Sequence, residues 1–366
     1  MAWTWDVIQK DWLLGGSIGV PPDEIVAAFN TAGRLLGDDW VDQHRKKPNG
    51  IVAGALPTLE VVQIGKSLAV VGGCEGVSQL LQRLKSGDRA AFSELKAIYL
   101  CSAGIDAEIE IEPYLQVEMR TRMSERKPDF RIRAPRSTWV YVEVAAPDVS
   151  EARQEAERVM QELASIFSMV PDNTALDLFL RRDPTQAEVE LLKADMVRYA
   201  QSAVACDYDE PGLAIISVNM SHPSFMEPRD FGDELYTPRL GLARSEGKAG
   251  SPATKRVSVR YPYSDERAKE FLKQEAKQLS REEPGLIMLS LNQAPGAFKI
   301  WNPLLHRCLQ PNQRTRVSGI CLFQSGIETT NAGQNCVFHT SVIENQHALH
   351  SLPTWLIDSL KRFDAA

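Results

Sequence analysis

Two acidic side chains in neighbouring apolar stretches offer the clearest prospect of chemistry in this chain. Asp129 follows Pro128 in the stretch KPDFRIR, and Glu143 interrupts the apolar run WVYVEVA. Because side chains alternate along a strand, the two acids can lie side by side if these stretches pair. Adjacent carboxylates repel each other unless a cation lies between them. A hard divalent ion takes oxygen ligands of this kind, and it can activate water and stabilise the charge of a phosphodiester transition state.

A plain ion pair is the competing interpretation of the same residues. Glu143 lies in a run that should be buried, and a buried carboxylate needs a partner. Arg131 or Arg133, which share the face of Asp129 in an extended strand, could supply that partner. For Asp129 itself, a strand-start role after Pro128 is the simpler alternative.

The surrounding sequence predicts the elements that would position the two acids. Asp88 is a good N-cap, Gly104 a good stop, and the apolar residues between them follow a helical period. The next stretch, IDAEIEIEP, alternates strictly, as a strand does. The predicted order is helix, three strands, helix and strand, over residues 88–104, 105–113, 128–132, 139–145, 149–167 and 174–182.

This order resembles the PD-(D/E)XK nuclease superfamily, whose fold is called restriction-endonuclease-like. The similarity covers about residues 88–182, and the stretches KQEAKQLSREEPGLIMLSL and RVSGICLF are similar to the C-terminal part of large bacterial proteins of this type. The resemblance implies that Asp129 is the motif aspartate and Glu143 the motif glutamate. It also implies that Glu94, on the preceding helix, completes a site for Mg²⁺ or Mn²⁺.

The chain departs from the family pattern at Ala145. Active members carry a lysine at this position, two residues after the glutamate, which orients or activates the attacking water. Some members move the basic group to the next helix, which makes Arg153 the first substitute here, ahead of Lys127 and Arg131. Arginine stays protonated, so it could stabilise charge but is a poor general base.

A basic segment surrounds the first acid. Between Arg120 and Arg136 the chain has seven basic residues and two acids. One interpretation is a rim that binds the phosphates of a nucleic acid. The other is a solvated turn that balances the acidic stripe of Glu108, Glu110 and Glu112, of which only Glu112 could reach the site. The residues expected in the rim are Arg126, Lys127, Arg131, Arg133 and Arg136.

Composition excludes several classes of protein. A net charge of −7 and a pI of about 5.5 argue against non-specific coating of nucleic acid. The chain has no run of about 18 apolar residues, the length that spans a membrane, and its N-terminus lacks the basic start of a signal peptide. Six cysteines without CxxC spacing indicate reduced thiols and a cytoplasmic protein. Walker and GxGxxG motifs are absent, and His347 with His350 is expected to be structural.

We therefore expect an α/β protein with a restriction-endonuclease-like mixed sheet flanked by helices. Its N-terminal extension should be helical, with a loop at 38–50, a hairpin at 59–72, and tryptophans as core or interface anchors. The four tryptophans of this part are Trp3, Trp5, Trp12 and Trp40. The expected division is an N-terminal extension, a first part of the core, an insertion with an irregular excursion at 221–256, and a completion of the core, over residues 1–75, 76–183, 184–256 and 257–366.

Three functions are compatible with these patterns. The leading one is a metal-dependent nuclease that hydrolyses DNA or RNA, with Asp129, Glu143 and Arg153 as its catalytic residues. The second is a pseudo-nuclease that keeps the fold and acts as a binding module, which Ala145 favours. The third is a structural or protein-interaction subunit. Nucleases of this fold often act as dimers, so the resemblance also allows a homodimer.

Overall fold

The chain forms two compact units in a computed structural model. Unit 1 comprises Met1–Pro147 and Glu266–Ala366, and unit 2 comprises Asp148–Asp265. Unit 2 therefore begins earlier and ends later than the insertion expected at 184–256. The structure describes residues 2–9, 18–46, 55–119, 122–202, 204–220, 239–246, 255–262, 267–292 and 297–363.

Unit 1 is built on a mixed six-stranded sheet with the strand order β1-β4-β5-β11-β12-β13. The first three strands are antiparallel neighbours, β5, β11 and β12 run parallel, and β13 returns antiparallel. A separate hairpin joins β2 to β3 (Leu115–Met119 and Arg122–Arg126). The strands of the sheet are β1 (Glu108–Ile111), β4 (Phe130–Arg133), β5 (Val140–Ala145), β11 (Gly285–Ser290), β12 (Gly319–Thr330) and β13 (Gly333–Glu344).

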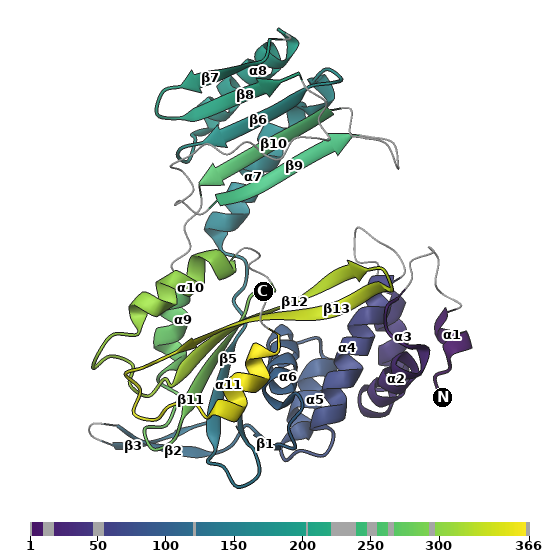
Figure 1. Ribbon diagram of the computed structural model, residues 1–366, viewed down its shortest axis with the longest axis vertical. Coiled ribbons are helices and arrows are strands. Elements are labelled where there is room, and N and C mark those ends of the chain that lie inside the picture. Colours follow the sequence, from purple (N-terminus) through teal and green to yellow (C-terminus); the bar gives the residue numbers. More distant parts are fainter. Residues whose placement is uncertain are drawn as a thin grey trace. The chain divides into compact units, whose positions relative to one another are not determined.

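Helices cover both faces of this sheet (Figure 1). Alternate residues of each strand point to opposite faces, so Val140 and Val142 join the core under the N-terminal helices while Tyr141 and Ala145 join the core under α9 and α10. The first layer holds α1 (Trp5–Gln9), α2 (Pro22–Leu36), α3 (Asp38–Lys46), α4 (Ala55–Val71), α5 (Val77–Lys85), α6 (Arg89–Ser102) and α11 (Thr354–Lys361). The second holds α9 (Arg267–Glu275) and α10 (Ala297–Cys308).

The sequence predictions for the N-terminal extension were wrong in two places. The hairpin expected at 59–72 is part of the helix α4, and the loop expected at 38–50 is the helix α3 as far as Lys46. A buried helix is apolar on every side, so its sequence cannot be told from two short strands by period alone. The expected role of the tryptophans is confirmed for Trp3 and Trp40, which are buried in the core, whereas Trp12 lies outside the described residues.

The helix and strand expected next to β5 lie in unit 2. The strand at Ala175–Leu180 (β6) pairs with β8 and β10, in a sheet of its own. In unit 1, the helix and strand that follow β5 are α9 and β11, and β11 lies parallel beside β5. Unit 1 thus contains the order α6, β1, β4, β5, α9, β11, with the hairpin β2–β3 and unit 2 inserted in the chain.

Strands β12 and β13 continue beyond the sheet as an arm. Only Gly319–Phe323 of β12 pair with β11, whereas the whole of β12 pairs with β13. The remaining residues, Gln324–Thr330 and Gly333–His339, form a two-stranded ribbon, and β13 packs against α4 (Figure 1). The Sγ of Cys336 donates to the carbonyl oxygen of Leu59 at 3.4 Å, which ties the arm to that helix.

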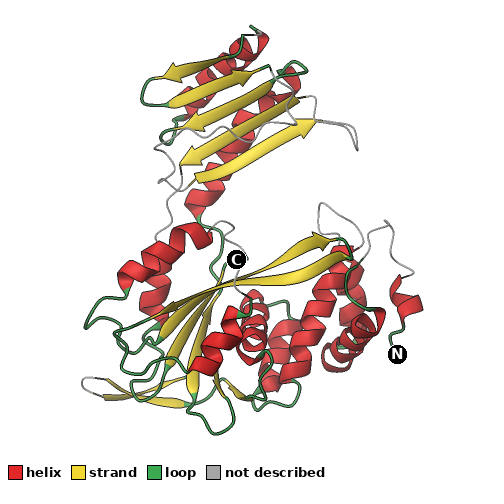
Figure 2. Ribbon diagram, viewed as in Figure 1, coloured by secondary structure: helices red, strands yellow, loops and turns green. Residues whose placement is uncertain are grey.

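Unit 2 is a five-stranded sheet with helices on one face (Figure 2). The strand order is β7-β8-β6-β10-β9. Its elements are α7 (Glu151–Leu163), a 3₁₀ helix (Ala164–Met169), β6, α8 (Gln186–Gln201), β7 (Cys206–Glu210), β8 (Ala214–Asn219), β9 (Arg239–Glu246) and β10 (Lys255–Pro262). Strand β9 lies within the excursion expected to be irregular; residues 221–238 and 247–254 lie outside the described part.

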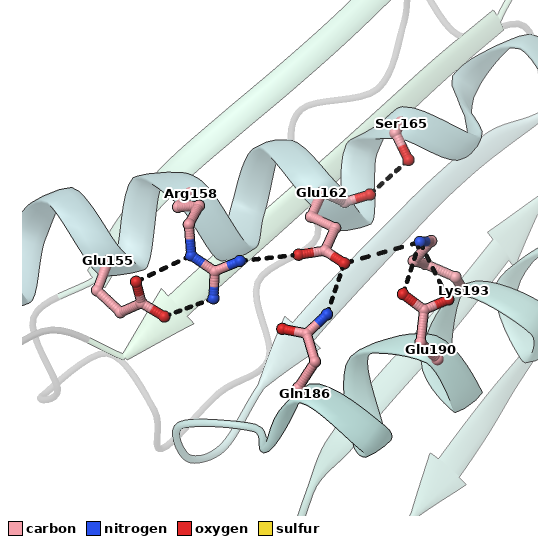
Figure 3. Close-up of polar contacts among 7 residues, drawn as sticks. All are labelled: Glu155, Arg158, Glu162, Ser165, Gln186, Glu190 and Lys193. Atoms are coloured by element: carbon pink, nitrogen blue, oxygen red, sulfur yellow. Dashed lines mark hydrogen bonds and ion pairs between the residues drawn. The ribbon is translucent and has the colours of Figure 1, made fainter.

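Polar side chains connect the two helices of unit 2 (Figure 3). Arg158 binds Glu155 at 2.6 Å and Glu162 at 3.1 Å along α7. Glu162 also accepts a hydrogen bond of 2.8 Å from Gln186 of α8 and lies 3.8 Å from Lys193 of the same helix. Because these groups are partly exposed, their ion pairs contribute little to the free energy of folding. Their main effect is on how α7 and α8 pack together. Among the described residues of the whole chain, no helix is long and apolar enough to cross a membrane.

Candidate active site

The two predicted acids meet on neighbouring strands of unit 1. Phe130 of β4 pairs with Val142 of β5 in antiparallel register, which places Asp129 opposite Glu143. Asp129 Oδ2 accepts a hydrogen bond of 2.6 Å from the backbone N–H of Val144. The sequence prediction that these acids lie side by side is therefore supported by the strand register.

Glu143 is buried without a partner for one of its oxygens. Its side chain points to the same face as Tyr141 and Ala145, the residue is 4% exposed, and Oε1 has no hydrogen-bond partner. Burial, followed by the charges of Asp129, Glu275 and Glu94, raises the pKa of Glu143 to about 10. These surroundings therefore favour the protonated form of the carboxyl group at neutral pH.

The ion pair considered for Glu143 is not formed. Arg131 instead donates to Glu110 at 2.6 Å, and Arg133 donates to Glu108 at 2.7 Å. Both pairs are cross-strand neighbours of β1 and β4, in the register that places opposite charges directly side by side. The acidic stripe of β1 thus neutralises these two arginines, and Glu143 has neither of them as its partner.

Asp129 has a similar electrostatic environment. Burial, followed by the charge of Glu94 and then that of Glu275, raises the pKa of Asp129 to about 7, against the opposing effects of the Val144 hydrogen bond and the Arg83 charge. Burial and the acidic neighbours of Asp129 thus outweigh the effect of Arg83 on its pKa.

Glu275, at the end of α9, is a member of this acidic cluster that the sequence analysis missed. Its charge acts on both Asp129 and Glu143, and burial raises its own pKa. The spacing of Ala268, Leu272 and Glu275 was the available signal, because it places Glu275 on the buried face of the helix. The spacing does not show which element covers this face, because the contact between α9 and β5 forms only in the folded unit.

Glu94 lies close to the pair but is engaged by an arginine. Arg83 Nη1 donates to Glu94 Oε2 at 2.8 Å, and Arg83 Nη2 donates to Glu94 Oε1 at 2.7 Å. The Nε of Arg83 donates to Asp88, the N-cap of α6, at 2.8 Å. Both oxygens of Glu94 are thus used by a bidentate ion pair, a contact that the sequence analysis did not anticipate for this residue.

The donor set fits a divalent ion that takes few protein ligands. Within the described part of the chain, no three His, Cys, Asp or Glu side chains are grouped so as to hold a metal ion by themselves. Mg²⁺, however, is usually bound by one or two carboxylates, and waters or phosphate oxygens complete its shell. Asp129 and the unpartnered Oε1 of Glu143 are two such oxygen donors, whereas Glu94 is committed to Arg83.

The expected substitute for the missing lysine lies in unit 2. Arg153 belongs to α7, and its Nε donates to Glu157 of the same helix at 2.7 Å. Ala145 is buried in the apolar core between β5 and α9. Among the described residues, the charges that shift the pKa of Glu143 are all acidic.

The residues expected in a phosphate-binding rim are in different surroundings. Arg131 and Arg133, already paired with acids, both lie 4.3 Å from the ring centroid of Trp139. Exposed Lys127 lies 4.4 Å from the ring centroid of Tyr114, and Arg136 is an exposed turn residue with a positive φ of 64°.

Arg126 lies in a cluster of like charge. After burial, the charges of Arg281 and Arg126 lower the pKa of Arg316, so both of these side chains lie near the Arg316 guanidinium group.

Comparisons with known proteins give no relative on which to base an assignment. No protein-family model, no curated protein and no solved structure matches this chain. The function of the acidic cluster therefore has to be argued from its own geometry.

Proposed function

We propose that unit 1 is a restriction-endonuclease-like nuclease domain whose Mg²⁺ or Mn²⁺ is held by Asp129 and Glu143. The observation that carries this proposal is the buried, unpartnered Oε1 of Glu143 opposite Asp129. A buried carboxylate without a partner is costly, and the neighbouring charges of Glu275 and Glu94 increase that cost. A divalent cation between the two carboxylates would offset it. The order α6, β1, β4, β5, α9, β11 supports the same assignment.

The bound ion would lower the pKa of a water molecule and stabilise negative charge on the phosphodiester. In the proposed reaction the water oxygen forms a bond to phosphorus, the P–O ester bond breaks, and the leaving oxygen takes up a proton. Asp129 and Glu143 orient the ion, and Glu275 accepts the proton of the attacking water. A carboxylate whose pKa is raised by burial suits this role better than an arginine does.

A pseudo-nuclease is the second candidate, and Ala145 favours it. The methyl side chain is buried against α9, so it offers no group to orient water. In this case the site would bind an ion, or a phosphate through an ion, without cleaving it. The proposed partner in both cases is DNA or RNA, and the arginine cluster of Arg126, Arg281 and Arg316 is the proposed contact for its phosphates.

The test combines cleavage with metal binding. Single- and double-stranded DNA and RNA are incubated with the full chain in Mg²⁺ and in Mn²⁺, and Mn²⁺ binding is measured by titration calorimetry. We expect cleavage that EDTA abolishes, and that Asp129→Asn and Glu143→Gln each lower by at least 100-fold. Glu275→Gln should lower cleavage while leaving Mn²⁺ affinity within a few-fold. Exposed Glu282 supplies the matched control, and Glu282→Gln should change neither measurement.

Each outcome separates the candidates. Mn²⁺ binding that depends on Asp129 and Glu143, without cleavage of any substrate, would select the pseudo-nuclease. Folded protein that neither binds Mn²⁺ nor cleaves would rule out both proposals. It would leave Glu143 as a buried, protonated structural residue.

A further inference from the structure

A pocket of about 460 Å³ lies in unit 1, and none of the residues that line it belongs to the acidic cluster. Residues of α4, α6 and the arm of β12 and β13 line it, together with Val20 and the two residues that follow α11. Its volume falls within the range of roughly 300–1,000 Å³ that is typical of small-molecule sites. The residues that matter for its chemistry are Gln63, Tyr99, Phe338, Arg362 and Phe363.

Three aromatic rings form one wall of this pocket. The ring centroids of Tyr99 and Phe338 are 5.7 Å apart, those of Phe338 and Phe363 are 5.9 Å apart, and those of Tyr99 and Phe363 are 6.4 Å apart. These rings come from α6, from the arm and from the residues after α11, so folding brings them together. Such a wall suits a planar ligand, because aromatic rings pack by offset or edge-to-face contact.

Arg362 supplies a positive charge to the same pocket. Its Nη1 donates to the carbonyl oxygen of Ala103 at 3.2 Å, and no carboxylate of the described residues pairs with it. Of the other ionisable residues of the lining, Lys66 lies 2.6 Å from Glu24, and Glu328 lies 3.8 Å from Nε2 of His339. A guanidinium group has five N–H donors, so Arg362 retains donors for an anion.

Gln63 is the second polar group that points to a ligand. It lines the pocket and is 7% exposed, and its Nε2 has no hydrogen-bond partner. Buried amide groups are nearly always hydrogen-bonded, so this one needs an explanation. An acceptor on a bound ligand would provide it once the Gln63 side chain rotates, because Nε2 is closed off from solvent in this conformation.

We propose that this pocket binds a small aromatic carboxylate. The ring packs on Tyr99, Phe338 and Phe363, the carboxylate pairs with Arg362, and Gln63 donates a hydrogen bond to the ligand. This binding is independent of the nuclease proposal, because it uses neither the acidic cluster nor a metal ion.

The test uses 2-naphthoate as the probe and 2-naphthalenemethanol as its neutral counterpart, with binding to the full chain measured by titration calorimetry. We expect the carboxylate to bind at least tenfold more tightly than the alcohol. Arg362→Gln should remove that preference, and Gln63→Leu should weaken naphthoate binding about fivefold. Arg307, an exposed arginine of α10, is the control, and Arg307→Gln should bind naphthoate as the parent does.

Gln63→Leu also separates a ligand contact from a structural role. Removing an unpartnered buried amide should leave the melting temperature unchanged or higher, whereas removing a structural hydrogen bond would lower it. Equal binding of the acid and the alcohol would overturn the proposal. So would naphthoate binding that neither Arg362→Gln nor Gln63→Leu alters in protein that remains folded.

Discussion

Asp129 accepts a hydrogen bond from the backbone N–H of Val144, so its carboxylate is held beside the residue that follows Glu143. This contact fixes Asp129 against β5 even though it precedes the first residue of β4. The two carboxyl groups are thereby brought together, and no basic side chain of the described residues hydrogen-bonds to either of them.

Glu143 should make the metal-free protein less stable as the pH rises. Its pKa is raised from about 4.5 to about 10, so the stability contributed by the neutral form is present below pH 4.5 and is lost as the pH rises toward 10. Glu143→Gln cannot ionise. We expect this variant to be more stable than the parent at pH 8, on the order of 2 kcal/mol, and about equal at pH 4.5. Urea unfolding at both pH values checks this, and parallel pH profiles of the two proteins would contradict it.

Binding of Mn²⁺ should release protons. The ion binds the ionised carboxylates, whereas Asp129, with a pKa of about 7, and Glu143, with a pKa of about 10, hold protons at neutral pH. Affinity should therefore rise between pH 6 and pH 8. Calorimetry in two buffers of different ionisation enthalpy gives the number of protons released, about one to two at pH 7. A binding enthalpy that is the same in both buffers would show that the ion binds elsewhere.

The ion pair of Arg83 with Glu94 should behave as a structural unit. Arg83→Met leaves a carboxylate that is 4% exposed without its partner, and we expect a loss of roughly 2–3 kcal/mol. Glu94→Gln in the same chain should recover part of this loss, because the amide carries no charge. The double-mutant cycle in urea measures the coupling, and additive effects would show that the two side chains do not interact.

Gly65 should be required where α4 crosses α2. A Cβ at this position would lie 2.2 Å from the backbone oxygen of Ala28, a contact that the backbone has to move to relieve. We expect Gly65→Ala to cost about 1–3 kcal/mol. Gly73→Ala is the matched control, because a Cβ there meets no atom within 4 Å. Thermal unfolding compares the two, and equal melting temperatures would mean that the helices do not approach this closely.

Unit 2 should fold by itself. Its sheet and its helices contact one another within Asp148–Asp265, and all of the tryptophans lie in unit 1. We expect a fragment of residues 148–265 to show helix and strand by circular dichroism and to unfold cooperatively. In the full chain, tryptophan fluorescence then follows unit 1 alone, while circular dichroism follows both units. A fragment that lacks a cooperative transition would show that unit 2 depends on the rest of the chain.

Local patterns predicted much of the secondary structure. The helix at 88–104 is observed as α6 with Asp88 as its N-cap, and the alternating stretch at 105–113 contains β1. These elements carry their signals in a few adjacent residues: a capping side chain, a helical period or a strict alternation. The facing of Asp129 and Glu143 was predictable for the same reason, since it needs only alternation and the pairing of two neighbouring strands.

Contacts between distant segments were decided by the tertiary structure alone. The helix at 149–167 and the strand at 174–182 have strong local patterns, but these patterns do not tell which sheet the elements join. Glu275 reaches the cluster because α9 packs on β5, and Arg83 engages Glu94 because α5 packs on α6. A buried charge is stable only beside a group that pairs with it. That group can come from a segment far away in the sequence, so only the packing of the folded chain decides which buried charges are paired.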